Sequence, residues 1–91
     1  MPDATRIDDR SRAAVDAILR ERQRQRDLWS TDHDDKHMPE DWLIILNAYT
    51  GKLSQCVHPY VPKGSYNKEK IVLRLTQLAA ISMAAIEALS E

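Results

Sequence analysis

The densest group of side chains that could do chemistry is a short polar run, D-H-D-D-K-H, at residues 32–37. Carboxylates and imidazoles are the groups with which proteins hold divalent cations. The run has no EF-hand spacing and no second ligand pair at a fixed distance, so the favoured interpretation is a hydrophilic turn between helices. The alternative is a metal site made of Asp32, His33, Asp34, Asp35 and His37.

Four arginines alternate with other polar residues between Arg20 and Arg26, which suggests a surface for nucleic acid. A spacing of two residues rotates side chains around a helix, so only Arg20 with Arg24, and Arg22 with Arg26, share a face. The residues between them include Glu21 and dilute the positive charge further. We therefore expect a solvated helix face or an interface with another subunit, and we do not expect nucleic acid as a partner.

Other signatures of catalysis are missing from the sequence. It has no phosphate-binding glycine loop, no Ser/His/Asp set at a recognisable spacing and no Cys/His zinc pattern. Lys and Arg number 13 against 14 Asp and Glu, giving a formal net charge of -1 and no global attraction to nucleic acid or to an anionic membrane. The lone Cys56 and the lack of a signal-peptide pattern favour a cytoplasmic protein.

The composition and the apolar spacing predict an all-α fold in one domain. Phenylalanine is absent and glycine occurs only at Gly51 and Gly64. After a mobile lead-in over residues 1–10, a single helical domain spans residues 11–91, with helices expected at about 11–29, 39–56 and 67–90. Helix starts are indicated by Asp8, Asp9 or Ser11, by Pro39, and by Ser65 or Asn67.

The third helix is apolar on most of its sides. One stripe follows helical spacing, and Val72, Ala79, Ala80, Met83 and Ala84 add small or apolar residues on other faces. The mostly apolar run Leu75 to Leu89 is interrupted by polar residues and too short for a bilayer, so we interpret it as a buried helix and expect no membrane contact. Two helices of the same chain cannot easily cover it, which predicts a homodimer or a higher homo-oligomer.

Three stretches together resemble a known family. They are E-R-Q-R-Q-R-D-L-W at 21–29, W-L-I-I-L-N-A-Y-T-G-K at 42–52 and L-R-L-T-Q-L-A-A-I-S-M-A-A-I-E-A-L at 73–89. The sequence is similar here to the MazG-like branch of the all-α nucleotide pyrophosphohydrolases. The resemblance implies a helical dimer or tetramer in which carboxylates on two facing helices hold Mg²⁺, for hydrolysis of a nucleoside triphosphate to its monophosphate and pyrophosphate.

The chain departs from this family at the metal ligands. The family holds its metal ion with E-E-x-x-E and E-x-x-D motifs. In this sequence the positions of those acidic residues are occupied by Ala48, Tyr49, Lys52, Arg74 and Gln77, none of which is a carboxylate. Two of these are cations and would repel a divalent ion. The comparison therefore predicts a MazG-like protein without catalysis and without a cofactor.

By the resemblance Lys52 and Arg74 would face one another across the family's metal site, where they could bind a phosphate directly, because a guanidinium suits that group well. The favoured interpretation is the simpler one, that both are ordinary surface cations. The full set of candidate residues for a nucleotide or other phosphate ligand is Lys52, Arg74, Gln77, Tyr49, Glu21 and Arg24. In the favoured interpretation both cations are solvated or pair with Glu21, Asp27 or Asp41.

Two further functional hypotheses stay open. One is an active pyrophosphohydrolase that uses Mg²⁺ at a relocated site built from Asp32, His33, Asp34, Asp35 or Glu40. The other is a protein-interaction module in which the polar helix between Arg20 and Asp27 meets an unrelated partner.

Overall fold

The computed structural model describes residues 8–29, 37–57, 62, 64 and 66–90. The described part of the chain is three α-helices without a strand: α1 over Asp9–Leu28, α3 over Pro39–Gln55 and α4 over Lys68–Leu89. The predicted all-α class is confirmed, and each predicted helix boundary lies within two residues of the observed one. Helix α1 begins at Asp9, inside the predicted lead-in, of which residues 1–7 lie outside the described residues.

The starts of α1 and α4 are set by side chains that accept backbone hydrogen bonds. Asp8 Oδ1 accepts from the Ser11 amide at 2.8 Å, and Asn67 Oδ1 accepts from the Lys70 amide at 3.2 Å. Each bond satisfies one of the amides that the first turn leaves without an intrahelical acceptor. Of the predicted caps, Asp8 and Asn67 therefore fill the role.

Helix α3 begins at Pro39, whose fixed φ suits the first helical position. The Asp41 carboxylate accepts from the Met38 amide at 2.8 Å and thereby ties the residue before the helix to its first turn. Glu40 and Asp41 both lie where the helix dipole favours negative charge. The predicted start of this helix is thus confirmed together with its physical cause.

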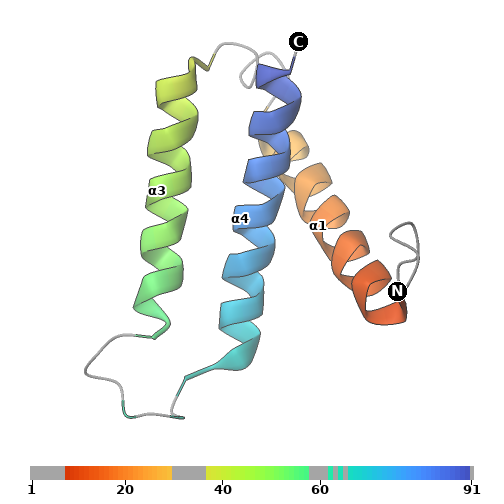
Figure 1. Ribbon diagram of the computed structural model, residues 1–91, viewed down its shortest axis with the longest axis vertical. Helices are drawn as coiled ribbons and strands as arrows, with labels where there is room; N and C mark the ends of the chain where they lie inside the picture. Colours follow the sequence, from red (N-terminus) through yellow and green to blue (C-terminus); the bar gives the residue numbers. More distant parts are fainter. Residues whose placement is uncertain (1–7, 30–36, 58–61, 63, 65, 91) are drawn as a thin grey trace, which may run out of the picture.

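Helix α4 is the central element, and both other helices pack on it. Figure 1 shows α3 and α4 side by side in opposite directions, with α1 behind α4 and diverging from it toward the N-terminus. Within α1, buried residues occur only in the C-terminal half, at Glu21, Arg22 and Gln25. The apolar positions of the N-terminal half, such as Val15 and Leu19, stay 41% and 49% exposed.

The hydrophobic core is small and lies between α3 and the C-terminal half of α4. Trp42 is 3% exposed and packs with Ile81, Ala84 and Ala85. Alanine on α4 allows the indole ring to approach the helix backbone closely. Ile45, Leu46, Tyr49 and Ala88 extend this cluster while keeping part of their surface in solvent.

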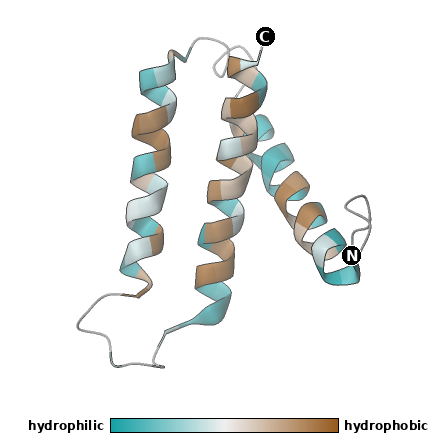
Figure 2. Ribbon diagram, in the orientation of Figure 1, coloured by the Kyte–Doolittle hydropathy of each residue, from teal (hydrophilic) through white to brown (hydrophobic). Residues whose placement is uncertain are grey.

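A second face of α4 has no covering helix among the described residues. Its large apolar side chains recur at helical spacing and are about half exposed or more: Val72, Leu75, Ile86 and Leu89. The stripe predicted for this helix consists of Ile71, Leu75, Leu78, Ser82, Ala85, Ile86 and Leu89, and of these only Ala85 is buried. The packing face instead follows Ala80, Ile81, Ala84 and Ala85, and Figure 2 shows apolar residues toward both ends of α4 as well as in the middle of α1.

The chain exposes more surface than its mass requires. Its accessible area is 7275 Å², whereas a folded monomer of 10.4 kDa has about 5,400 Å² by the usual scaling. Its radius of gyration is 15.4 Å, against about 12 Å for a compact domain of this length.

Helix α4 is also longer than the apolar run that the sequence suggested. It spans 22 residues, and by length and composition alone it is the one helix in the described part of the chain that could cross a membrane. The expectation of no membrane contact was based on the shorter run Leu75 to Leu89 and stays a prediction. The same test is passed by core helices of globular proteins, which are mostly buried, whereas 22% of the apolar window of α4 is buried in this structure.

The cap at Asn67 gives a direct test of what starts the central helix. Asn67→Ala is expected to lower the free energy of unfolding by about 1 kcal/mol, because the Lys70 amide loses its acceptor. Asn67→Asp keeps an acceptor and is expected to stay within a few tenths of a kcal/mol of the wild type. Urea denaturation followed by circular dichroism measures both, and an Asn67→Ala variant as stable as the wild type would show that the cap is not needed.

Candidate functional site

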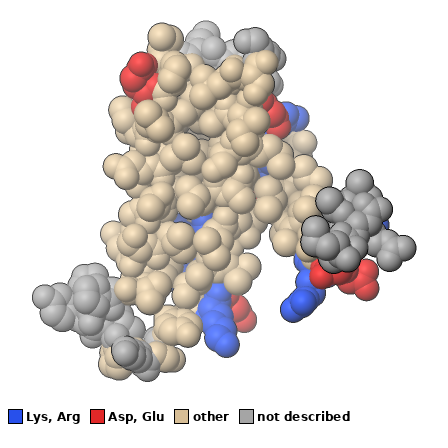
Figure 3. All heavy atoms as spheres, viewed as in Figure 1, with Lys and Arg blue, Asp and Glu red and all other residues tan. Residues whose placement is uncertain are grey.

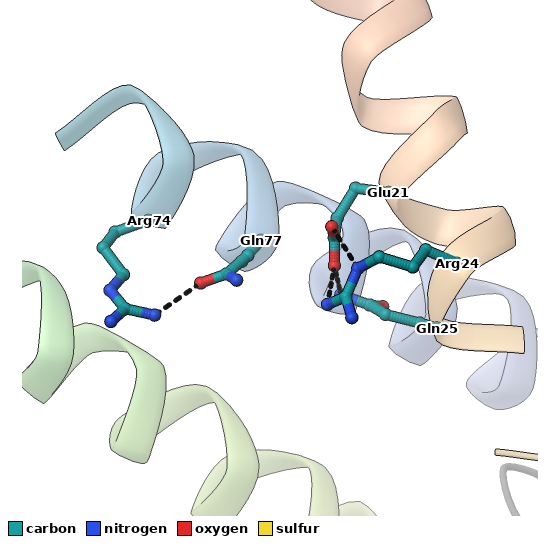
Figure 4. Close-up of polar contacts among 5 residues, drawn as sticks. All are labelled: Glu21, Arg24, Gln25, Arg74 and Gln77. Atoms are coloured by element: carbon teal, nitrogen blue, oxygen red, sulfur yellow. Dashed lines mark hydrogen bonds and ion pairs between the residues drawn. The ribbon is translucent and has the colours of Figure 1, made fainter. Parts of the chain in front are cut away.

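The residues at the positions of the family's metal ligands form one contact within α3 and one within α4. The Lys52 ammonium lies 4.5 Å from the centroid of the Tyr49 ring, a cation–π contact within one turn of α3. On α4, Arg74 Nη1 donates to Gln77 Oε1 at 3.0 Å. Figure 4 shows the Arg74 side chain extending from α4 toward α3.

The helix register brings these two pairs to the same level of the hairpin. Trp42 of α3 packs against Ala84 of the antiparallel α4. Ten residues along each helix from that contact, a distance of about 15 Å, lie Lys52 and Arg74. The predicted juxtaposition of the two cations is therefore consistent with the backbone arrangement.

Arg74 has a donor that the described residues leave unused. Its Nε is buried and has no hydrogen-bond partner among them, although its Nη1 is engaged by Gln77. A buried donor without an acceptor costs about 1–3 kcal/mol. The guanidinium is thus held by Gln77 through one Nη group, while its Nε has no acceptor among the described residues. The side-chain hydrogen bond of Arg74 is therefore to Gln77 and not to Glu21, Asp27 or Asp41, the suggested alternatives. Lys52 is exposed, as the surface-cation interpretation expected.

Glu21 and Arg24, also predicted to bind the ligand, form a separate network on α1. Arg24 donates through Nε and Nη2 to the two Glu21 oxygens at 2.8 and 2.7 Å, and Gln25 Nε2 donates to Glu21 Oε2 at 3.0 Å. Figure 4 shows this group on α1, with no hydrogen bond drawn between it and the pair on α4. The contacts of the six candidate residues therefore form three pairs: Tyr49 with Lys52, Arg74 with Gln77, and Glu21 with Arg24.

Both oxygens of the Glu21 carboxylate accept hydrogen bonds within this network. The hydrogen bond from Arg24 is the main cause that lowers the pKa of Glu21, and the bond from Gln25 acts in the same direction against the effect of burial. In return the hydrogen bond that Arg24 donates to Glu21 raises the pKa of Arg24, with a smaller contribution from Tyr49 of α3. Glu21 is thus ionised and has its oxygens occupied by neighbours on its own helix.

One side of the polar half of α1 is a packing surface, whereas Arg20, Gln23, Arg24, Arg26 and Asp27 are exposed. Arg22 is 6% exposed, and its Nη2 lies 3.2 Å from Glu87 Oε2 on α4. Arg26 Nη2 lies 3.0 Å from the same oxygen. The expectation of a solvated face was therefore wrong for Arg22 and Gln25, because the carboxylates of Glu87 and Glu21 provide the partners that allow these polar groups to be buried.

A cavity of about 380 Å³ opens between α1, α3 and α4 on the side of the Trp42 core. Aliphatic side chains of α3 and α4 form part of its wall, and the aromatic and polar part consists of Arg22, Gln25, Trp29, His37, Trp42 and Tyr49. Sequence analysis did not find this site. The signal was present, because Arg22, Gln25 and Trp29 share the i, i+3, i+7 spacing of one helix face.

Most of the run proposed as a metal site lies outside the described residues. This applies to Asp32, His33, Asp34 and Asp35. His37 is described, and its ring meets Trp42 edge-on with centroids 5.0 Å apart, while its Nδ1 lies 4.0 Å from Asp41 Oδ2. Glu40 is exposed in the first turn of α3. Over the residues that the structure describes, His, Cys, Asp and Glu side chains form no group of three that could hold a metal ion.

Comparison with known proteins adds no relative. The chain matches no protein-family model, no curated protein and no solved structure. The similarity to MazG-like proteins therefore rests on the sequence stretches themselves.

The lowered pKa of Glu21 predicts how stability depends on pH. A carboxyl group whose pKa is depressed by folding stabilises the native state above its unfolded pKa, about 4.3 for glutamate, and loses that contribution as pH falls toward the folded value. We expect wild-type stability to decrease on acidification through this range. Glu21→Gln should be less stable than the wild type at pH 7, and the gap should narrow at pH 3.

Thermal unfolding from pH 7 to pH 3 measures the effect. Asp16→Asn is the control, because this exposed carboxylate lies on the same helix and outside the network. Parallel pH curves for Glu21→Gln and the wild type would mean that the contacts of Glu21 with Arg24 and Gln25 contribute nothing to stability.

Proposed function

We propose that this chain is a subunit of a homo-oligomeric, non-catalytic protein on a MazG-like helical scaffold, which binds the phosphate group of a nucleotide or of another phosphorylated ligand. The binding residues in this proposal are Lys52, Arg74 and Gln77. The observation that carries it is the buried Arg74 Nε, which lacks an acceptor among the described residues at the level of the hairpin where Lys52 adds a second positive charge.

Two cations favour an anion over a metal ion at this place. A divalent cation between Lys52 and Arg74 would meet like charge on both sides. A phosphate oxygen would instead accept from the planar guanidinium and gain the attraction of the ammonium. Gln77 supports this role because its oxygen fixes one Nη group and leaves Nε for the ligand.

The absence of carboxylates at the positions equivalent to the family's metal ligands supports a role without hydrolysis. Tyr49 and Lys52 stand on α3 and Arg74 and Gln77 on α4 where the resemblance places acidic residues. Glu21, the buried carboxylate of α1, is held by Arg24 and Gln25. In this proposal the protein retains or senses its ligand and does not cleave it.

The oligomer in this proposal is closed by a second copy of the chain against the uncovered face of α4. The exposed apolar side chains of this face, Val72, Leu75, Ile86 and Leu89, support such a pairing. In Figure 3 charged side chains lie mainly near the helix ends, and most of the face formed by α3 and α4 is uncharged. A twofold pairing would let the same apolar face of both copies cover each other.

Binding of phosphate is tested by calorimetry with a panel of nucleoside triphosphates in the presence of a chelator. We expect binding without magnesium and a loss of about tenfold or more in affinity for Arg74→Ala and for Lys52→Ala, because each removes one charge-assisted contact. Lys70→Ala, an exposed cation in the first turn of α4, is the control and should change affinity less than about twofold. Absence of binding at millimolar ligand would refute the phosphate site, and magnesium-dependent release of pyrophosphate would favour the hydrolase hypothesis instead.

The oligomer is tested by sedimentation velocity at micromolar concentration. We expect a mass of at least twice the 10.4 kDa of one chain, and a shift toward the monomer in Val72→Glu and Ile86→Glu, whose wild-type side chains are 60% and 66% exposed. Asn47→Glu, at an exposed position of α3, is the control and should keep the wild-type mass. A wild-type chain that sediments as a folded monomer, or that is recovered only with lipid vesicles, would contradict the pairing of two copies.

A further inference from the structure

The uncovered face of α4 has the spacing of a coiled-coil seam. Its residues follow one another at alternating intervals of four and three: Lys68, Val72, Leu75, Ala79, Ser82, Ile86 and Leu89. The other helices of the chain pack on other sides of α4, because Trp42 of α3 contacts Ile81 and Arg22 of α1 pairs with Glu87. The large apolar residues of the seam are 48–66% exposed. The seam is therefore open to a helix from outside the chain.

Side-chain size along this seam increases symmetrically from its centre toward both ends. The order outward is Ala79 and Ser82, then Leu75 and Ile86, then Val72 and Leu89. Two helices that cross are closest at the crossing point and move apart toward their ends. Small side chains at the centre and larger ones on either side therefore fit a second helix that crosses α4 at Ala79 and Ser82.

A second copy of the same helix, running in the opposite direction, matches this order residue for residue. Leu75 then lies opposite the partner's Ile86, and Val72 lies opposite the partner's Leu89. A shift by one heptad destroys the match. In one direction it places Ile86 against the ammonium of the partner's Lys68, and in the other it leaves Val72 and Leu75 beyond the end of the partner's helix.

The one hydroxyl group in the seam is already satisfied within its own helix. Ser82 Oγ donates to the Leu78 carbonyl oxygen of the preceding turn at 2.9 Å. Buried polar groups need a hydrogen-bond partner, and this hydroxyl keeps its partner when a second helix covers it. Ser82 thus contributes a small side chain at the crossing point without leaving a buried donor unsatisfied.

The charge at the start of α4 favours the antiparallel direction. Within the described range Lys68–Leu89, the last turn has no basic residue to interact with the partial negative charge of the C-terminal carbonyls. Antiparallel pairing brings the partner's Lys68 to this end, about one turn beyond Leu89. Parallel pairing would instead bring the two Lys68 side chains together and align the two helix dipoles, and both effects are unfavourable.

We propose that a second copy of the chain binds along this seam in the antiparallel direction, with the twofold axis between Ala79 and Ser82 and with Lys68 of each copy at the C-terminal end of the other α4. This inference rests on the proposed oligomer, because it specifies how the two copies meet. It makes no use of the proposed phosphate site at Lys52 and Arg74.

Disulfide cross-linking between single-cysteine variants tests the direction and the register. Leu75→Cys and Ile86→Cys are each made together with Cys56→Ser, which removes the native thiol. One variant is labelled with ¹⁵N, so that mass spectrometry separates the mixed disulfide from the symmetric ones. We expect the mixed disulfide to be the main product when the two variants are combined and oxidised. Each variant alone should stay uncross-linked, because its two cysteines would lie about 16 Å apart along the seam.

Asn47→Cys, at an exposed position of α3, is the matched control and should not cross-link to Ile86→Cys. Cross-linking of Leu75→Cys with itself as readily as with Ile86→Cys would overturn the antiparallel register. A wild-type dimer whose associated cysteine variants form no mixed disulfide would overturn this inference and leave the proposed oligomer intact. A wild-type monomer would overturn both.

Lys68→Ala tests the direction without new cysteines and decides the matter if the cysteine variants do not fold or associate. It should raise the dissociation constant of the dimer about threefold or more in sedimentation equilibrium, because each dimer loses two contacts with a helix C-terminus. Lys70→Ala, a cation of the same turn outside the seam, is the control and should change that constant less than about twofold. Equal effects of the two variants, or a tighter dimer in Lys68→Ala, would overturn the antiparallel pairing.

Discussion

Helix α4 carries apolar side chains on more of its circumference than α1 and α3 can cover. Its inner face of Ala80, Ile81 and Ala84 packs on the other two helices, and its outer face, including Val72 and Ile86, stays in solvent. Apolar area removed from water is the main favourable term in folding, and a chain of 91 residues has little of it to spare. The open arrangement of the helices, the excess area and the proposed oligomer all follow from this one imbalance.

Polar side chains hold α1 where apolar contacts are scarce. Arg22 and Arg26 share the carboxylate of Glu87, and Glu21 is enclosed by Arg24 and Gln25. Such partly buried pairs fix the position of a helix more than they add to stability, since desolvation offsets much of the attraction. Because these contacts all lie in the C-terminal half of α1, that half is fixed on α4 and forms a wall of the cavity, while the half that begins at Asp9 diverges.

The helices were predictable because their signals are local. Asp8, Pro39 and Asn67 lie beside the turns that they start, so the sequence alone indicated each boundary to within two residues. The face of α4 that becomes buried was not predictable, because apolar residues lie on several sides and only contact with Trp42 selects among them. For the same reason the arginine run of α1 was interpreted as solvated: Arg22 is buried by a partner, Glu87, that lies 65 residues away in the sequence. The same distinction applies to the candidate sites. The positions of Lys52 and Arg74 along the two antiparallel helices follow from helix spacing and could be predicted. The aromatic cavity could not, because it is formed only when all three helices pack together.

The dependence of the unfolding temperature on protein concentration tests most directly whether a second copy completes the core. Association of native chains stabilises them by mass action, whereas an unfolding monomer does not respond to concentration. The account predicts that the midpoint of thermal unfolding rises continuously as the chain is concentrated a hundredfold. A single cooperative transition whose midpoint is the same across that range would show that the three helices are sufficient alone, and would contradict the central claim.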